Sequence, residues 1–186
     1  MSRTDAPSPS DSYAIRRAAQ PAEFAAAHRL FLEYQRAIDV DLCFQGFQAE
    51  LADLQGRYGR ADSGLWLAWH GALPVGCAAL RPESGPPEDR AGELKRLYVR
   101  PDWQGLGVGR RLLAAVIAGA EAAGYARLRL DTLWRFESAN RLYEQAGFVE
   151  IGNYNGNTLD GTRFLERALA PAAAGKPRIE AAGPVS

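Results

Sequence analysis

One segment constrains the fold of this chain more than any other: a glycine-rich turn between a strand pattern and a helix pattern. The turn reads Gln104-Gly105-Leu106-Gly107-Val108-Gly109-Arg110, and the helix after it carries one apolar stripe, formed by Leu112, Leu113, Val116 and Ile117. Glycines let successive backbone N–H groups point into one concavity, and the helix N-terminus adds partial positive charge. The pattern predicts a phosphate or pyrophosphate cradle, with Arg110 and Arg111 beside it.

Other interpretations of this turn must be weighed. Glycines at alternate positions also suit a tight turn that holds no ligand, and that alternative stays open on the turn alone. A Rossmann dinucleotide site would place its first glycine directly after the strand, whereas residues 100–104, with Pro101, intervene here. A Walker-type loop would end in Gly-Lys-Ser/Thr, which this segment lacks. Both nucleotide-binding classes are therefore disfavoured.

Strand and helix patterns alternate along the chain, which predicts a single α/β (α+β) domain. We expect strands at 13–17, 65–70, 75–80, 93–99, 127–132, 148–151 and 163–169. We expect helices from Pro21 to residue 38, at 47–57, from the glycine-rich turn to a stop at Gly124, and at 138–145. Residues 1–12 and 170–186 are rich in Ala, Pro, Gly and Ser, so we expect disordered tails around a domain at 13–169.

Composition excludes several classes of protein. Lys plus Arg and Asp plus Glu number 22 each, which argues against a nucleic-acid binder. The start lacks the apolar core of a signal peptide, and no apolar run approaches the ~20 residues of a membrane span, so we expect a soluble, cytoplasmic protein. Cys43 and Cys77 are expected to be reduced and buried, since a chain of this size does not need a disulfide; a disulfide between them is the alternative. No residues have metal-ligand spacing, and His28 and His70 are expected to be structural or exposed.

Three motifs in order point to a family. They are the run 93–101, the Q-x-x-G-x-G pattern of Gln104, Gly107 and Gly109, and Leu142-Tyr143-Glu144-Gln145-Ala146-Gly147-Phe148. Together, over about residues 93–151, they resemble the GCN5-related N-acetyltransferase (GNAT) superfamily. The resemblance implies a mixed central sheet with splayed middle strands, flanked by about four helices. It also implies an N-acyltransferase that moves an acetyl group from acetyl-CoA to a primary amine by direct transfer in a ternary complex. A non-catalytic CoA-binding sensor or regulatory module on the same fold is the alternative.

The resemblance assigns donor contacts to particular residues. Strands 93–99 and 127–132 would be the splayed pair, with the backbone of Leu97 and Val99 on the pantetheine arm and the turn on the pyrophosphate. The implied donor-binding residues are Leu97, Tyr98, Val99, Gln104, Gly105, Leu106, Gly107, Val108, Gly109, Arg110 and Asn140. Asn140 is the least direct of these, because the family often carries its asparagine seven residues before the tyrosine, where this chain has Phe136. A solvated helix position is the alternative for Asn140.

The resemblance also suggests catalytic roles. Tyr143 would be the general acid that protonates the departing thiolate; packing in the core is the alternative. Glu93 would be the general base, directly or through a water; an exposed residue or an ion-pair partner of Lys95 or an arginine is the alternative. Asp131 is a second candidate base. The N–H of Val99 would polarise the acetyl carbonyl.

The acceptor site is less defined. We expect residues 39–47, 132–136 and 154–160 to form it, and Trp134, Arg135, Phe136 and Tyr154 within or beside them suit an aromatic, acidic or mixed substrate, or else belong to core and rim. The acceptor is therefore expected to be a small-molecule or peptide amine. The final strands could also pair between subunits in a homodimer.

Overall fold

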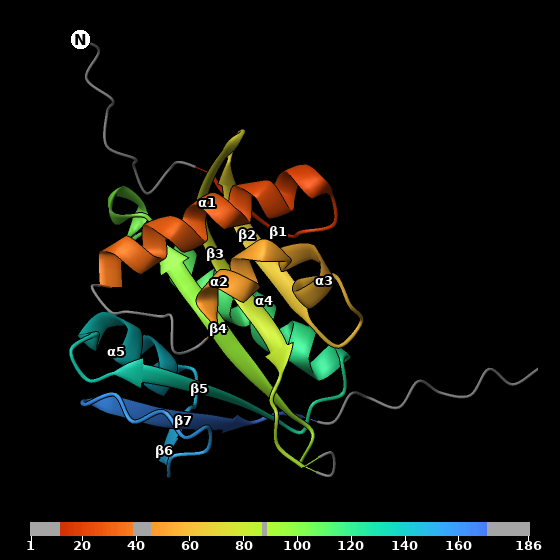
Figure 1. Ribbon diagram of the computed structural model, residues 1–186. Helices are drawn as coiled ribbons and strands as arrows, with labels where there is room; N and C mark the ends of the chain where they lie inside the picture. The colour runs from red at the N-terminus through yellow and green to blue at the C-terminus, as the bar shows by residue number, and fades with distance from the viewer. Residues whose placement is uncertain (1–11, 39–45, 87–88, 171–186) are drawn as a thin grey trace, which may run out of the picture.

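Strand β4 is the central strand of the sheet (Figure 1). Beyond its first residues it no longer pairs with its neighbour β5 within the described chain. The computed structural model describes residues 12–38, 46–86 and 89–170. These residues form a seven-stranded sheet in the order β1-β2-β3-β4-β5-β7-β6. The strands are β1 Ala14–Arg17, β2 Gly64–His70, β3 Leu73–Pro82, β4 Ala91–Val99, β5 Arg127–Leu133, β6 Val149–Ile151 and β7 Thr162–Ala168. All neighbouring pairs are antiparallel except β4 and β5, which makes the sheet mixed.

Helices cover both faces of this sheet. Along the described chain they are α1 Pro21–Ile38, α2 Phe47–Ala52, α3 Leu54–Tyr58, α4 Val108–Ala122 and α5 Glu137–Gln145, with a 3₁₀ turn at Pro101–Trp103. Phe24, Leu30 and Phe31 of α1 pack with α2 and α3 against one face. The apolar stripe of α4, with Tyr143 of α5, packs against the other. Each face therefore has its own apolar core.

Local sequence explains where the long helices begin and end. Pro21 occupies the first position of α1, where a missing N–H costs nothing, and Glu23 accepts hydrogen bonds from the N–H groups of Ala19 and Gln20. Helix α4 starts after Gly107, and Gly124 at φ 76° ends it in the left-handed conformation. The predicted stop at Gly124 is confirmed.

The parallel pair β4–β5 is joined over a short length only. Ala91, Gly92 and Glu93 pair with Arg127–Arg129, and no pairing between β4 and β5 follows among the described residues. Figure 1 shows the two arrows running from a common origin and diverging toward their C-terminal ends. The predicted fold class, with splayed middle strands, is confirmed.

A bulge in β4 accompanies this divergence. The β3–β4 register shifts between Cys77 and Ala79, so that Arg96 and Leu97 lie opposite Ala78 alone. Arg96 has φ 57°, a left-handed conformation that costs a non-glycine residue roughly 1–2 kcal/mol. A bulge re-aims the side chains beyond it and ends regular pairing. Lys95 and Arg96 consequently both reach polar partners on the α1 face.

Two sequence predictions need correction. The single helix expected at 47–57 is two short helices, because Asp53, at φ −147°, breaks the first and caps the second through a hydrogen bond to the Gly56 N–H. The described chain has five α-helices where about four were expected. Cys77 is free and buried as predicted, whereas Cys43 and nearly all of the two expected tails lie outside the described residues.

Candidate active site

A cavity of about 930 Å³ lies at the place where β4 and β5 separate. Its size falls in the range of small-ligand and cofactor sites. One end, here called the loop end, is lined by residues including Gln104, Gly105, Gly107, Gly109, Arg110, Ser138 and Arg141. The opposite end, here called the α1 end, is lined by residues including Tyr34, Ile38, Tyr98, Arg135 and Phe136. Tyr143, Lys95 and Asp131 also line this cavity.

Backbone groups form the loop end. Gly105 and Gly107 have φ 76° and 80°, left-handed values that favour glycine. The N–H groups in the first turn of α4 have no partner within that helix, because intrahelical bonding begins only with Arg111, whose N–H donates to the Gly107 carbonyl. Free N–H groups and the helix dipole together suit a bound anion. The geometry is the one expected of the cradle, and anion binding there stays a prediction.

Fewer groups are available to a ligand in the cradle than the sequence suggested. The N–H of Gln104 donates to the Pro101 carbonyl, so free N–H groups begin at Gly105. Leu106 and Val108 pack toward the core and offer only backbone. Arg110 lines the cavity, whereas Arg111 lies over the ring of Tyr13, with Cζ 4.7 Å from its centroid, and donates to the Tyr13 carbonyl. Arg111 is therefore directed away from the predicted site.

The edge of β4 is available beside the cradle. The N–H of Arg100 donates to the Val75 carbonyl on β3, and alternation along the strand then turns the N–H of Val99 away from β3, toward the gap. The Val99 carbonyl faces the same way and accepts a hydrogen bond of 3.0 Å from the Gln104 side chain. Leu97 and Val99 both line the cavity. An extended amide-bearing ligand could add to this edge as a strand does.

Tyr143 has the core position that was its alternative, yet it also lines the cavity. Its residue is 6% exposed, and its ring packs edge-on against Phe148 at 5.9 Å between centroids. Burial raises the pKa of the phenol well above its ordinary value, so the group keeps its proton at neutral pH. Tyr143 is thus a neutral hydrogen-bond donor beside the gap between the strands.

Asn140 is buried, so its interpretation as a solvated helix residue is wrong. Its residue is 5% exposed, and Nδ2 donates to the carbonyls of Leu133 and Trp134 at 2.9 and 3.1 Å. Oδ1 is buried without a partner among the described residues. Asn140 is outside the cavity lining. The side chain fixes the loop between β5 and α5, and a direct contact with CoA stays a prediction.

Glu93 is held in ion pairs. Its carboxylate contacts Lys95 at 3.0 Å and Arg81 at 2.7 Å, and accepts a hydrogen bond of 2.8 Å from the Tyr154 hydroxyl. Burial would raise the pKa of Glu93, but Lys95 and Arg81 outweigh it and lower the pKa. Glu93 is also outside the cavity lining. This geometry favours the ion-pair alternative over a direct role as base.

Asp131 has the more favourable position of the two candidate bases. It lines the cavity, contacts Lys95 at 2.7 Å and accepts a hydrogen bond of 2.9 Å from Asn157. Burial would raise its pKa, but Lys95 and the asparagine hydrogen bonds lower it. Burial raises the pKa of both Tyr34 and Tyr143, and the charge of Asp131 adds to each shift. Of the two candidate bases, Asp131 is therefore the one that reaches the cavity.

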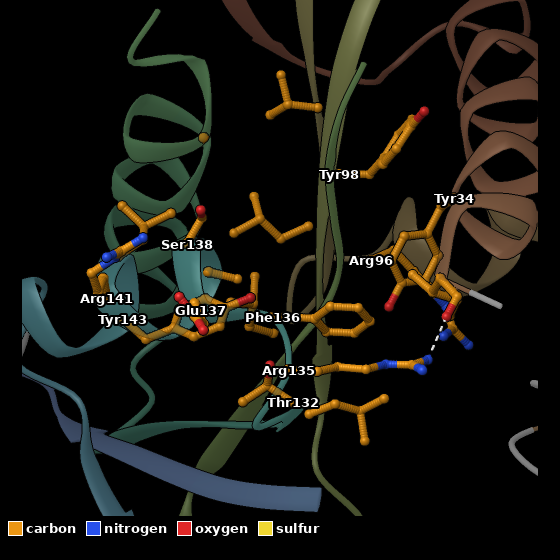
Figure 2. A pocket seen from close by; sticks show the side chains of 18 of the residues that line it. Tyr34, Arg96, Tyr98, Thr132, Arg135, Phe136, Glu137, Ser138, Arg141 and Tyr143 are labelled. Atoms are coloured by element: carbon orange, nitrogen blue, oxygen red, sulfur yellow. Dashed lines mark hydrogen bonds between the residues drawn. The ribbon is translucent and has the colours of Figure 1, made fainter. Parts of the chain in front are cut away.

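Side chains from distant segments form the α1 end. In Figure 2, Arg135 and Phe136 project side by side toward Tyr34 and Arg96, while Ser138, Arg141 and Tyr143 lie on the other side of the view. Leu159, within the predicted segment 154–160, lines the cavity, whereas Tyr34, Ile38 and Thr162 line it without any sequence motif to mark them. Of the predicted acceptor residues, Arg135 and Phe136 line it; Trp134 is 66% exposed and Tyr154 contacts Glu93 instead. Part of the predicted segment 39–47 lies outside the described residues.

Residues 12–38, 46–86 and 89–170 contain neither a metal-binding cluster nor a membrane-spanning helix. No group of three or more His, Cys, Asp and Glu side chains has a metal-binding arrangement there. No helix among those residues is long and apolar enough to cross a membrane.

Comparison with known proteins agrees with this geometry. The sequence profile of the acetyltransferase (GNAT) domain matches residues 61–150. An uncharacterised N-acetyltransferase of Schizosaccharomyces pombe is 36% identical over 143 residues, which are 76% of this chain and 85% of the yeast protein. The chain belongs to the GNAT superfamily. It is an acetyltransferase of that family by this relationship.

Other GNAT proteins are similar over different lengths. A mouse protein named probable N-acetyltransferase family 8 member 5 is 33% identical over 116 residues, 62% of this chain and 51% of the mouse protein. This GNAT chain thus spans about half the length of that relative. A Salmonella typhimurium protein, solved with its cofactor acetyl-CoA, is 22% identical with a TM-score of 0.62, covering 87% of this chain and 96% of its own. At this level of identity, the similarity to the Salmonella typhimurium protein shows a shared fold only.

Proposed function

We propose that this GNAT protein transfers an acetyl group from acetyl-CoA to a primary amine, and that donor and acceptor occupy opposite ends of one cavity. One observation carries the proposal: the free edge of β4 and the N–H cradle at Gly105–Arg110 line the same cavity of about 930 Å³. A pyrophosphate and an amide-bearing arm are the groups that these two features suit. The Salmonella typhimurium neighbour with acetyl-CoA supports this choice of donor.

The chain's own residues fit such a donor. Arg110 and Arg141, both lining the loop end, supply positive charge for phosphate groups. The N–H groups from Gly105 onward bind the pyrophosphate, and the β4 edge at Leu97 and Val99 binds the pantetheine amides. The side-chain hydrogen bond from Gln104 to the Val99 carbonyl competes for that edge and exchanges for the ligand on binding.

Transfer then follows from the groups near the junction of β4 and β5. The amine nitrogen attacks the thioester carbonyl, the C–N bond forms and the C–S bond breaks. The Val99 N–H donates to the developing oxyanion. Tyr143, which keeps its proton at neutral pH because burial raises the pKa of its phenol, donates that proton to the leaving sulfur. Asp131 holds the acceptor's ammonium group and passes its proton to water, because its own pKa is too low to retain it.

The proposed mechanism has no acyl-enzyme intermediate. Cys77 is buried, its Sγ lies 3.5 Å from the Arg96 carbonyl, and burial raises the pKa of its thiol far above the range of a nucleophilic cysteine. Direct transfer therefore needs both substrates bound together.

The test combines binding with turnover. We expect acetyl-CoA to raise the melting temperature of the purified protein, while NADH and ATP at equal concentration do not; ligand at about 100 times Kd adds roughly 2.7 kcal/mol. CoA thiol release in the presence of a panel of amines then measures transfer. Absence of a shift with millimolar acetyl-CoA would refute the donor site. Donor binding without thiol release from any amine would support a non-catalytic CoA-binding module instead.

A further inference from the structure

Arg135 differs from the neighbouring cations at the α1 end because its contacts are a backbone carbonyl and an aromatic ring, not a carboxylate. It projects from the loop between β5 and α5, and its Nη2 donates to the Ile38 carbonyl at the end of α1, at 2.7 Å. Its Cζ lies 5.4 Å from the centre of the Phe136 ring. A carbonyl and a ring thus fix the guanidinium without neutralising it. Arg135 lines the cavity and is exposed.

The neighbouring cations are already neutralised. Lys95 contacts Glu93 and Asp131 at 3.0 and 2.7 Å, and Arg96 contacts Glu50 at 2.7 Å. Arg135 has no carboxylate within ion-pair distance among the described residues. A guanidinium held in one orientation, with N–H groups left over, is the arrangement that recognises a carboxylate through two parallel hydrogen bonds.

Asp131 places a carboxylate in the same cavity, where it is paired with Lys95 at 2.7 Å. Its side chain is 8% exposed and accepts a hydrogen bond of 2.9 Å from Asn157. Because Asp131 and Arg135 line one cavity, a ligand with both an ammonium group and a carboxylate has a partner of opposite charge for each. The walls nearby are apolar or aromatic, from Tyr34, Tyr98 and Phe136. The cavity therefore combines a carboxylate paired with Lys95, a guanidinium with no ion-pair partner among the described residues, and an apolar wall.

Building on the proposed function, we propose that the acceptor is an amino acid with an apolar side chain, and that its carboxylate pairs with Arg135. A single arginine matches the single charge of a carboxylate, whereas a phosphate dianion would call for a second unpaired cation at this end. The transfer forms the amide bond at the amino group, releases CoA, and leaves the carboxylate unchanged as its anchor. The products are an N-acetyl amino acid and CoA.

The test compares each acid with its own amide. Thiol release is measured with acetyl-CoA and leucine, methionine or phenylalanine, and with the corresponding amino-acid amides, for the wild type and Arg135→Gln. We expect the wild type to prefer at least one acid, and Arg135→Gln to lower kcat/KM for that acid by about tenfold to a hundredfold, the range for a charge-assisted hydrogen bond. The amide's kcat/KM should change by less than about twofold. Comparing ratios between proteins cancels the difference in amine pKa between acid and amide.

A matched variant controls for charge. Arg141→Gln removes a guanidinium from the loop end of the same cavity, so it should weaken acetyl-CoA binding without changing the acid-to-amide ratio. Equal losses for acid and amide in Arg135→Gln, or turnover of the amides alone, would overturn the inference while leaving acetyl transfer established. Donor binding with no turnover of any of the acids would also overturn it. Absence of acetyl-CoA binding would instead overturn the proposed function itself.

Discussion

The two ends of the cavity are built in different ways. The loop end is formed mainly by backbone from one continuous stretch, the N–H groups of 105–110, which extend from the 3₁₀ turn after β4 into the first turn of α4. The α1 end is formed by side chains from four separate parts of the chain, represented by Tyr34, Tyr98, Arg135 and Leu159. A site made from backbone tolerates most changes of side chain, whereas a site made from side chains changes with each substitution. The same fold can therefore keep its donor and vary its acceptor.

Ion pairs show a related difference. Arg96, beside the bulge of β4, is neutralised by Glu50, which itself accepts a hydrogen bond of 2.5 Å from Tyr58. Arg135, on the opposite wall, contacts a neutral carbonyl and a ring, and no carboxylate of the described residues lies within ion-pair distance of it. The first arginine supports the structure around the α1 end, and the second is available to a ligand. Substitutions can distinguish residues that support the structure from residues that bind or react with a ligand.

The largest effect is expected at Tyr143, between the two ends. Tyr143→Phe removes the only proposed proton donor to the leaving thiolate, so kcat should fall by about 10²- to 10³-fold. The ring and its packing against Phe148 are kept, so the acetyl-CoA dissociation constant should change by less than about twofold. Single-turnover rates and calorimetric titration measure the two quantities. Equal loss of binding and rate would contradict the assigned role.

A large loss of stability is expected at Glu50. Glu50→Ala leaves the buried Arg96 without this carboxylate, and breaking a buried ion pair of this kind costs about 3 kcal/mol. Urea unfolding measures the change. Glu33→Ala, which breaks a half-exposed pair with Arg100, is the control and should cost no more than about 1 kcal/mol. Similar losses in the two variants would show that the Arg96 pair has no special structural role.

The same pair predicts a dependence on pH. Burial would raise the pKa of Glu50, but hydrogen bonds and charge from Arg96 lower it below the ordinary value of 4.5. Its stabilisation is therefore fully present above about pH 4.5 and is lost as the pH falls through the folded-state pKa. Wild-type stability should decline in this acid range more steeply than that of Glu50→Ala. Parallel curves would contradict the sign of the shift.

A smaller and more local effect is expected in the glycine loop. Gly105→Ala places a Cβ on a residue at φ 76°, where strain of roughly 1–2 kcal/mol rather than a clash is the penalty, because nothing lies within 4 Å of the added atom. This strain should lower the stability of the fold and also distort the cradle. We expect acetyl-CoA binding to weaken about tenfold. Gly156→Ala, at φ 72° and equally free of neighbours, carries the same strain away from the cavity. Equal affinities in the two variants would argue against the cradle.

Much of the loop end could be predicted from the sequence because its determinants are contiguous. The glycines, the strand before them and the helix after them follow one another within 91–122, and each sets local geometry through its own φ, hydrogen bonds or apolar stripe. Even there, tertiary contacts changed details. Arg111 lies on Tyr13, and the N–H of Gln104 is bound by Pro101, neither of which the spacing reveals.

The α1 end could be predicted only in part because its residues meet through the fold. Arg135 and Phe136 were predictable from their position after a splayed strand, but Tyr34 and Ile38 have the same helical spacing as core residues. Glu93 illustrates the limit most clearly. Its place near the start of β4 suggests a base, yet its carboxylate is bound by Lys95, two residues along the same strand, and by Arg81, which only the pairing of β3 with β4 brings to it.

The central claim is that both ends are filled at once, and initial-rate kinetics test it most directly. CoA release would be measured while acetyl-CoA and an accepted amine are varied together. Direct transfer in a ternary complex predicts double-reciprocal lines that intersect. Parallel lines, as for a covalent acetyl-enzyme that releases CoA before the amine binds, would contradict the account.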